Sequence, residues 1–323
     1  MKAVVCPQYG SPDVLQVQQV AKPTPQADEV LIKVHATSVT PSDCAFRKAD
    51  PFLIRLLYGL TKPRLTVPGV EFAGEIEAVG GAVTTFKVGD RVYGLSPDRF
   101  GAQAEYLVLP ASKPLTLMPA QLPYSEAVGL ADGAATALIF LRDVAHVQRG
   151  QRVLINGASG AVGIYAVQIA KYYGAHVTGV CSGANAALVQ AAGADAVIDY
   201  TREDFTKNGQ TYDVIFDAVG KRTYGACQRA LTPMGVYLTT VPTLGTVVAL
   251  LRTARSRGKR AAFTTAGLKQ NRANLDFLTA LFEAGALKAV IDRCYPLEQV
   301  AEAHRYVETG RKKGNVILTV VAG

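Results

Sequence analysis

The chain has 323 residues, a net charge of +8 and 49% hydrophobic residues. This length and composition provide for two packed cores and exclude an intrinsically disordered chain. The sequence begins without an apolar segment behind basic residues and contains no apolar run of about 18 residues, so we expect neither secretion nor a membrane partner.

Five single cysteines carry no metal or disulfide pattern. None belongs to a Cys-x-x-Cys pair and their number is odd: Cys6, Cys44, Cys181, Cys227 and Cys294. This usage indicates a reduced protein, and we expect it in the cytoplasm.

Short β-type runs dominate the first part of the chain. Turn-forming residues such as "KPTP" and "VGD" separate them, and we expect strands at 29–39, 71–80, 90–95 and 104–110. This pattern predicts a mostly β domain over residues 1–123.

The pattern changes near Tyr124, where long helical periods begin to alternate with short apolar runs. Such alternation predicts β-α-β units and a parallel sheet covered by helices. The fold class is therefore α/β, with a doubly wound sheet in residues 124–267. We expect its strands at 152–156, 176–181, 196–199, 213–218, 235–240 and 261–266.

The C-terminal segments 290–296 and 315–320 alternate like the first region. We therefore expect residues 268–323 to fold back and join residues 1–123 in one domain.

The stretch "INGASGAVG", residues 155–163, joins a predicted strand to a predicted helix. Glycines in this G-x-x-G-x-x-G spacing allow a tight turn, a close approach of the backbone to a pyrophosphate, and close packing of helix on strand. Amides at the helix start complement phosphate charge. The alternative is that the glycines merely ease packing. We expect dinucleotide contacts from the whole turn: Gly157, Ala158, Ser159, Gly160, Ala161, Val162 and Gly163.

The end of the second strand bears on the choice of dinucleotide. NAD sites usually place an acid there to hold the ribose 2′-hydroxyl, and the sequence has no acid in residues 144–194. Ser182 and Asn185 can donate hydrogen bonds to a 2′-phosphate, with Tyr200 beside them and help from Arg202. This pattern favours NADPH over NADH. The alternative is that Ser182 and Asn185 cap the following helix.

Ordered motifs along almost the whole chain resemble one protein family. Besides the glycine turn they include "VTPSDCAFRKAD", "VPGVEFAGEIEAVG", "FKVGDRVYG", "AEYLVLP", "YDVIFDAVG" and "KKGNVILTV". In this combination the chain resembles the medium-chain dehydrogenase/reductase superfamily, in its zinc-independent quinone oxidoreductase branch. The resemblance implies a GroES-like catalytic domain, a Rossmann domain, and a cofactor in the cleft between them.

The resemblance also shows where zinc ligands are missing. In zinc alcohol dehydrogenases of the superfamily a cysteine precedes "x-S-D" and a histidine precedes the glutamate of "G-H-E". Thr40 and Val70 stand at these places in this chain. Neither side chain replaces the metal ligand, so we expect no metal.

A site without zinc narrows the expected chemistry. Alcohol oxidation needs a group that stabilises an alkoxide, whereas reduction of a quinone or an activated double bond is less demanding. We therefore expect hydride transfer from NADPH to quinones or α,β-unsaturated carbonyls, that is, enones and enals. The alternatives are a zinc-free alcohol dehydrogenase, or an NADPH-binding protein with a nucleic-acid-binding or structural role.

Ser42 and Tyr58 are the candidates for the proton donor. The resemblance places Ser42 at the proton-relay hydroxyl of "x-S-D", and Tyr58 in a variable stretch where related quinone reductases place a tyrosine near the substrate. Ser42 could instead stand in a turn or cap after Pro41, and Tyr58 could be a packed aromatic. If neither donates the proton, water or the cofactor's ribose hydroxyl remains.

The resemblance implies further cofactor contacts on other segments. They lie near the nicotinamide and phosphates, or on the C-terminal segment that closes over the cofactor: Thr136, Val219, Gly220, Val241, Gly314 and Asn315. Each has a structural alternative, namely a threonine bonded to its own helix, ordinary core residues, or a turn into the last strand.

Two apolar stretches, 46–66 and 242–260, flank the expected cleft and imply a hydrophobic small-molecule acceptor. The family often pairs the last Rossmann strands of two subunits, so we also expect a homodimer formed through 261–266.

One basic cluster stands out from the dispersed positive charge. No RNA-binding aromatic motif accompanies it, so we expect a solvated face or a rim that attracts a small anion, not a nucleic-acid partner. The cluster comprises Arg252, Arg255, Arg257, Lys259 and Arg260.

Overall fold

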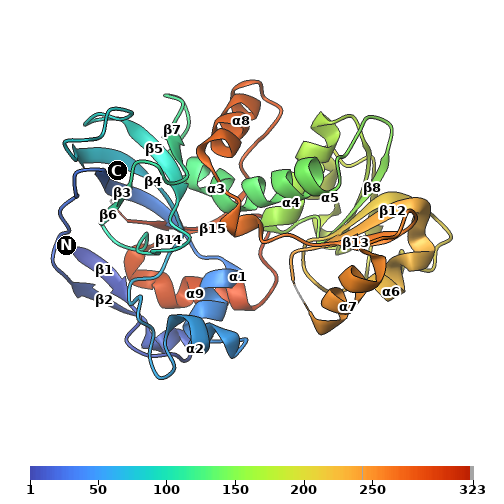
Figure 1. Ribbon diagram of the computed structural model, residues 1–323, viewed down its shortest axis with the longest axis horizontal. Coiled ribbons are helices and arrows are strands. Elements are labelled where there is room, and N and C mark those ends of the chain that lie inside the picture. Colours follow the sequence, from blue (N-terminus) through green and yellow to red (C-terminus); the bar gives the residue numbers. More distant parts are fainter. Residues whose placement is uncertain (242, 321–323) are drawn as a thin grey trace. The chain divides into compact units, whose positions relative to one another are not determined.

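The computed structural model describes residues 1–241 and 243–320 and divides into two compact units (Figure 1). Unit 1 comprises residues 1–132, 270–280 and 289 onward, and unit 2 comprises residues 133–269 and 281–288. The first division falls within helix α3 (Tyr124–Leu138), further along the chain than residue 123. Residues 281–288 join unit 2, which the sequence does not predict.

Unit 1 is built on a mixed sheet with strand order β14-β15-β3-β4-β5-β7, and β6 also pairs with β3. β15 pairs antiparallel with β3, so the expected C-terminal return to the first region is confirmed. The strands are β3 (Glu29–Ser38), β4 (Glu71–Val79), β5 (Arg91–Leu95), β6 (Tyr106–Pro110), β7 (Leu115–Leu117), β14 (Ile291–Pro296) and β15 (Asn315–Thr319), beside a separate pair β1 (Lys2–Val5) and β2 (Gln16–Gln19).

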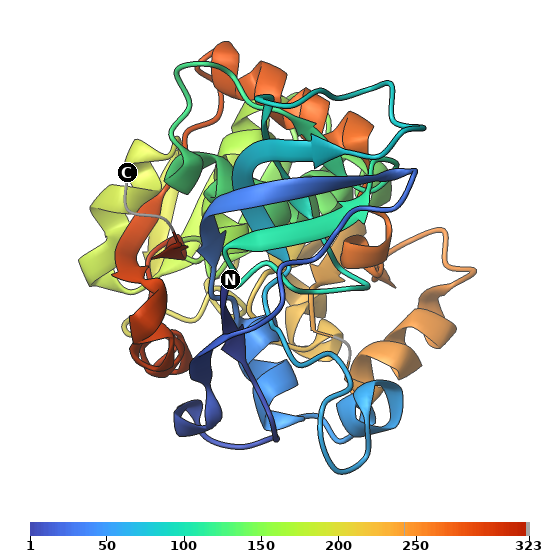
Figure 2. The same ribbon diagram turned by 90° about the vertical axis from the view of Figure 1, so that its left-hand side faces the viewer.

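Alternating apolar residues of β3 form the centre of unit 1. Figure 2 shows the ribbon with the strands of this unit facing the viewer. Val30, Ile32 and Val34 are fully buried with Phe72 and Ile76 of β4 in one core cluster. Period-two alternation of this kind places every second side chain on the same face of a sheet. Unit 1 contains in full the helices α1 (Pro41–Lys48), α2 (Leu53–Tyr58) and α9 (Val300–Glu308).

Unit 2 is a parallel sheet with strand order β10-β9-β8-β11-β12-β13. From β8 the chain adds strands first on one side, as β9 and β10, and then on the other side, as β11, β12 and β13. The place between β8 and β11 is the switch point of a Rossmann sheet, so the expected α/β fold class is confirmed. The strands are β8 (Arg152–Asn156), β9 (His176–Cys181), β10 (Ala196–Asp199), β11 (Tyr212–Asp217), β12 (Leu231–Thr239) and β13 (Arg260–Ala262).

The strand expected at 261–266 is wrong beyond Ala262. β13 pairs with β12 over only three residue pairs, and the chain then forms a 3-10 turn at Ala266–Leu268. An apolar pattern alone does not show how far a neighbouring strand continues, and strand length depends on that partner.

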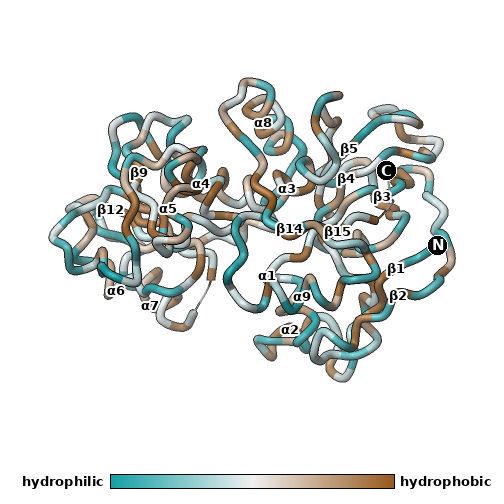
Figure 3. Tube along the Cα trace, turned by 180° about the vertical axis from the view of Figure 1, so that it is seen from behind, coloured by the Kyte–Doolittle hydropathy of each residue, from teal (hydrophilic) through white to brown (hydrophobic). Residues whose placement is uncertain are grey.

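Other helices belong to unit 2, and Figure 3 shows apolar segments along α4 and the strands. They are α4 (Ala161–Tyr172), α5 (Ala186–Ala191), α6 (Tyr224–Cys227) and α7 (Leu244–Thr253). Two further helices run from unit 1 into unit 2: α3, which continues as a π-helix over Ile139–Val144, and α8 (Arg272–Glu283). Within the described residues no helix is long and apolar enough to cross a bilayer.

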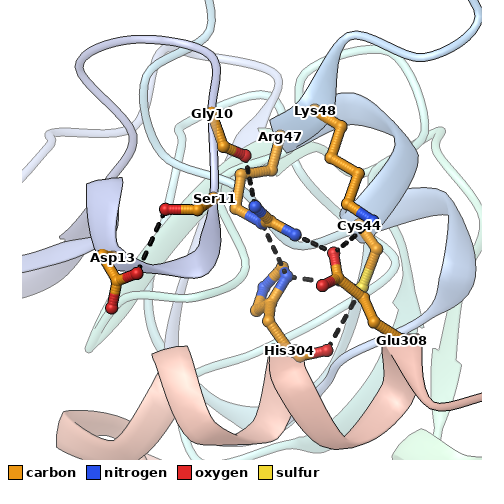
Figure 4. A network of polar contacts seen from close by, with 8 residues as sticks. All are labelled: Gly10, Ser11, Asp13, Cys44, Arg47, Lys48, His304 and Glu308. Carbon is orange, nitrogen blue, oxygen red and sulfur yellow. Dashed lines mark hydrogen bonds and ion pairs between the residues drawn. The ribbon is translucent and has the colours of Figure 1, made fainter.

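A buried arginine links three segments of unit 1 (Figure 4). Arg47 of α1 is only 1% exposed; it donates to the carbonyl of Gly10, forms an ion pair with Glu308 of α9, and reaches Nδ1 of His304 at 3.4 Å. Burial lowers the pKa of His304 to about 3, and the Arg47 charge acts in the same direction, so this imidazole is neutral. Arg47 therefore holds α1, α9 and the N-terminal segment together.

We expect Arg47→Ala to lower the free energy of unfolding by about 3 kcal/mol, because it leaves the mostly buried Glu308 without its main partner. Lys48→Ala is the matched control. Lys48 contacts the same carboxylate at 3.1 Å but its side chain is 45% exposed, so we expect a change below about 0.5 kcal/mol. Urea unfolding measures both, and equal losses would contradict the structural role of Arg47.

Candidate functional site

The turn between β8 and α4 has no room for side chains at two of its glycines. Gly157 has φ of +81°, and a Cβ there would lie 2.4 Å from Cγ1 of Val219. A Cβ on Gly163 would lie 2.1 Å from the carbonyl oxygen of Gly157, but a Cβ on Gly160 would meet only that oxygen, at 3.4 Å. Packing therefore accounts for Gly157 and Gly163 and does not account for Gly160.

The amides of the turn divide into two groups. Those of Gly157 and Ala158 both donate to the carbonyl of Val180 on β9, at 3.0 Å each. α4 starts at Ala161, and its N-cap, Gly160, provides no side chain to cap the first turn. First-turn amides of a helix lack partners within the helix. The amides suited to a phosphate are thus those at the start of α4.

Asp217, at the end of β11, connects the carboxyl ends of neighbouring strands beside this turn. Its Oδ1 accepts from Nδ2 of Asn156 at 2.9 Å and from the amide of Val219 at 3.3 Å. Its Oδ2 accepts from the amide of Arg222 at 2.7 Å and from the hydroxyl of Tyr237 at 3.3 Å. Asp217 belongs to the motif "YDVIFDAVG", but the sequence pattern did not predict this role for it.

The ends of β11 and β12 meet the glycine turn within unit 2. The side chain of Val219 covers Gly157, and a Cβ on Gly220, whose φ is +65°, would lie 2.5 Å from Cβ of Val241. Thr240 donates to the carbonyl of Ala218 at 3.2 Å. The structure thus brings Gly157, Val219, Gly220 and Val241 together at the switch point, where doubly wound sheets bind ligands.

The second strand, β9, ends beside the same turn. Asn185 donates from Nδ2 to Oγ of Ser159 at 3.0 Å, and neither Ser182 nor Asn185 forms a side-chain helix cap. Both residues stand at N-cap positions, but neither side chain makes a capping hydrogen bond. Tyr200 is exposed, and its amide donates to the carbonyl of Cys181, the residue before Ser182.

Asp199 is an acid that the sequence analysis missed at this edge, because it comes from β10 and not from β9. It pairs in register with Cys181, and a Cβ on Gly183 would lie 2.6 Å from its Oδ2. Hydrogen bonds from Thr201 lower its pKa, and Arg202 lies 3.8 Å away. The carboxylate is ionised and partly neutralised within the protein.

Thr136 and the Gly314–Asn315 pair belong to different units. Thr136 is buried on α3 one turn after Gly133, where a Cβ would lie 2.9 Å from the carbonyl of Ala161. Gly314 and Asn315 lie in unit 1, where Asn315 donates twice to the carbonyl of Val290, at 2.9 and 3.1 Å. A turn into β15 accounts for this pair.

Unit 1 contains a small cavity, of about 30 Å³, beside the start of α1. Ser42 is exposed at its wall, Thr40 caps α1 in a capping box with Asp43, and the wall also includes Val70. The capping alternative for this segment thus applies to Thr40, and within residues 1–241 and 243–320 the Ser42 hydroxyl makes no hydrogen bond.

Tyr58 packs on the aromatic side of the cavity and does not line it. Its ring centroid lies 5.3 Å from that of Phe46 and 5.6 Å from that of Phe100, and these two phenylalanines form the wall. The structure therefore brings Ser42 and Tyr58 to neighbouring places, with a packing role that is evident for Tyr58.

Two buried carboxyls lie at the cavity: Asp43 is part of its wall, and Glu71 follows the wall residue Val70. The sequence pattern predicted a role for neither. Burial raises the pKa of Asp43 to about 6, against hydrogen bonds from Thr40. Glu71, next to Val70, is 1% exposed; burial and the Asp132 carboxylate raise its pKa well above the ordinary value. Glu71 accepts from the Ser38 hydroxyl and, at 2.6 Å, from the amide of Asp132.

Lys312 adds a cation to this buried group. Burial lowers its pKa to about 8, whereas the carboxylates of Glu71 and Asp292 act in the opposite direction. Its Nζ donates to the carbonyl of Gly314 at 2.8 Å. In sequence Lys312 stands among other basic residues, and no pattern distinguishes it from them.

Thr40 and Val70, which stand where zinc alcohol dehydrogenases have metal ligands, both lie near the start of α1. Thr40 donates its hydroxyl to Asp43 at 2.6 Å, and Val70 lines the cavity. Across residues 1–241 and 243–320, no three His, Cys, Asp or Glu side chains gather in a way that could hold a metal ion. That this protein works without zinc stays a prediction from its residue types.

We expect the contribution of Glu71 to the stability of the protein to fall as the pH rises from about 5 to about 8. A carboxyl with a raised pKa keeps its proton in the folded state while the unfolded chain loses it above the ordinary value of 4.5. Glu71→Gln is expected to reduce this fall by about 1–3 kcal/mol, and Glu75→Gln, at an exposed site on the same strand, is expected to leave it unchanged. Urea unfolding over this pH range measures the effect, and parallel curves for Glu71→Gln and the unmodified chain would contradict it.

The chain matches known proteins over nearly its whole length. The sequence profile of the alcohol dehydrogenase GroES-like domain matches residues 26–123, and that of the zinc-binding dehydrogenase matches residues 192–318. An NADPH-dependent alkenal/one oxidoreductase from Arabidopsis thaliana is 33% identical over 98% of this chain and 79% of its own length. A 2-methylene-furan-3-one reductase from Solanum lycopersicum is 34% identical over the same shares.

A solved structure shows the same architecture. The quinone oxidoreductase from Coxiella burnetii superposes with a TM-score of 0.90 at 29% identity, over 99% of each chain. With these relatives and with Thr40 and Val70 at the ligand places, the chain belongs to the zinc-independent quinone oxidoreductase branch of the medium-chain dehydrogenase/reductase superfamily.

Proposed function

We propose that this protein is a zinc-independent reductase that transfers hydride from NADPH to quinones or α,β-unsaturated carbonyls. The observation that carries the proposal is the glycine turn at the switch point of a parallel sheet, followed by the first-turn amides of α4, which suit a phosphate. The relatives named as alkenal/one, furanone and quinone reductases support the acceptor class.

The preference for NADPH rests on the edge formed by Ser182, Asn185 and Tyr200. Ser182 and Asn185 are not used as caps, and Arg202 supplies a positive charge nearby. Asp199 opposes a 2′-phosphate, but Arg202 and the hydrogen bonds from Thr201 reduce this effect. We therefore keep NADPH as the proposed dinucleotide.

Within this proposal each segment has a separate task. Bound NADPH supplies the hydride, and one proton must reach the acceptor as well. The amides at the start of α4 hold the phosphates, and Val219, Gly220 and Val241 orient the nicotinamide. Thr136, Gly314 and Asn315 are further proposed contacts.

Ser42 is the proposed proton donor because its hydroxyl stands at the wall of the unit 1 cavity. Tyr58 is the second candidate, with weaker support because its ring packs against Phe46 and Phe100. A hydrophobic acceptor suits the apolar residues of this unit, among which Phe52, Leu53 and Leu56 are exposed.

A cytoplasmic homodimer completes the proposal. β13 is an edge of the unit 2 sheet and pairs with β12 alone among the described strands. Its free edge supports pairing with the same strand of a second copy, although only three residues are extended.

We expect Gly160→Ala to weaken NADPH binding by at least about tenfold while the protein stays as stable, because the turn itself has room for the methyl group but a bound pyrophosphate would not. Gly81→Ala, which places a methyl in open space, is the control. Fluorescence titration gives the Kd and thermal melting the stability. An unchanged Kd for Gly160→Ala would remove the pyrophosphate from this turn.

We expect the purified protein to oxidise NADPH when quinones, enones or enals are added, and Ser42→Ala to lower kcat by about 100-fold. Tyr58→Phe keeps the packed ring and is expected to retain most of the turnover. Loss of nicotinamide absorbance measures both. Full turnover in both variants would assign the proton to water or to the ribose hydroxyl, and no turnover with any acceptor would refute the proposed reaction.

A further inference from the structure

Helix α7 presents two apolar faces, and unit 2 covers only one of them. Thr246, Ala249 and Thr253 are buried, and Leu250 packs against the core of the unit. Thr253 accepts from the amide of Ala261 at 3.0 Å, which joins this face to β13. The inner face therefore accounts for the attachment of α7 to its unit.

The outer face of α7 is a stripe of large aliphatic side chains. Leu244 is 82% exposed and Leu251 is 75% exposed, with Val247 at 45% and Val248 at 38% between them. Their spacing of i, i+3, i+4 and i+7 places all four on one side of the helix. A solvent-facing side of a helix is ordinarily polar, so this stripe indicates a further apolar surface that covers it.

Positive charge without any acid continues from the stripe. No Asp or Glu occurs between Asp217 and Asp276 in the sequence. Arg252, Arg255, Arg257 and Arg260 are exposed, and in the described part of the chain no carboxylate pairs with them. Lys259 differs, because its Nζ donates to the carbonyl of Gln228.

The two features together fit one kind of partner. Guanidinium groups bind phosphates well, and aliphatic side chains enter an acyl layer. An anionic lipid surface offers phosphates directly above acyl chains. We propose that the outer face of α7, with the arginines at 252–260, docks on an anionic lipid surface.

Other occupants fit less well. A nucleic acid supplies phosphates but no apolar layer, and its unpaired bases stack on aromatic side chains, of which the chain has none between Tyr237 and Phe263. A second copy packed by two-fold symmetry on the stripe itself, rather than along β13, would bring the arginines that follow the stripe in the two chains close together. The apolar stripe and the lack of aromatic side chains therefore disfavour a nucleic acid, and the positive charge disfavours a second copy packed on the stripe.

This inference departs from the expectation of no membrane partner, which rested on the absence of a membrane-spanning segment. Docking on a surface needs no such segment, because a short apolar stripe and basic residues are sufficient. It also does not depend on the proposed reaction, since lipid binding is measured without cofactor or acceptor.

The test is co-sedimentation of the full chain with vesicles of phosphatidylcholine alone and of phosphatidylcholine mixed with phosphatidylglycerol. We expect binding to the mixed vesicles, weakened by salt. The variant Leu244→Ser/Leu251→Ser and the variant Arg255→Ser/Arg257→Ser/Arg260→Ser are each expected to bind at least about tenfold more weakly. Met234→Ser, which removes another exposed apolar side chain of unit 2, is expected to bind normally.

Thermal melting establishes that the variants are folded, and sedimentation velocity without lipid reports their oligomeric state. Absence of binding to mixed vesicles, or binding that neither variant weakens, overturns the inference. A leucine variant that turns from dimer to monomer assigns the stripe to a second copy and also overturns it. The inference is also overturned if vesicles do not bind while single-stranded RNA binds to the unmodified chain and not to the arginine variant.

Discussion

The four hydrogen bonds to the Asp217 carboxylate organise the part of the molecule on which its proposed chemistry depends. They come from Asn156 at the end of β8, from Tyr237 of β12, and from the amides of Val219 and Arg222. A buried carboxylate needs such partners, because unpaired charge is costly away from water. Here those partners are the segments that end at the switch point, so one side chain sets the positions of β8, β12 and the loop after β11.

The glycines of the turn follow from the same convergence. Val219, held by Asp217, occupies the space where a side chain on Gly157 would lie, and Gly157 in turn leaves no room for one on Gly163. Gly160 takes no part in this series of close contacts, because a Cβ there would meet only the carbonyl oxygen of Gly157 at an ordinary distance. A glycine without a packing reason, at the start of a helix whose first amides lack partners in the helix, points to a ligand that approaches the backbone closely.

The two units differ in where their charged side chains lie. In unit 1 the buried ionisable groups Arg47 and Glu71 join segments that are distant in sequence. Unit 2 keeps most of its charge outside, and over one long segment that charge is entirely positive. Apolar side chains beside those arginines make α7 a helix with a covered face and an uncovered one, which distinguishes it from an ordinary helix packed on a sheet.

Much of the fold was determined by the sequence itself. Period-two and helical patterns placed β8, β9 and β10 at their observed bounds, and the glycine spacing located the turn between β8 and α4, because these signals are local. The tertiary structure decided the rest. It shortened β13, brought Asp199 from a neighbouring strand beside Gly183, and buried Asp43, Glu71 and Lys312 near one another. It also separated Leu250, which faces the core, from Leu251, which does not. Burial and proximity depend on which segments the fold brings together, and no local pattern contains that information.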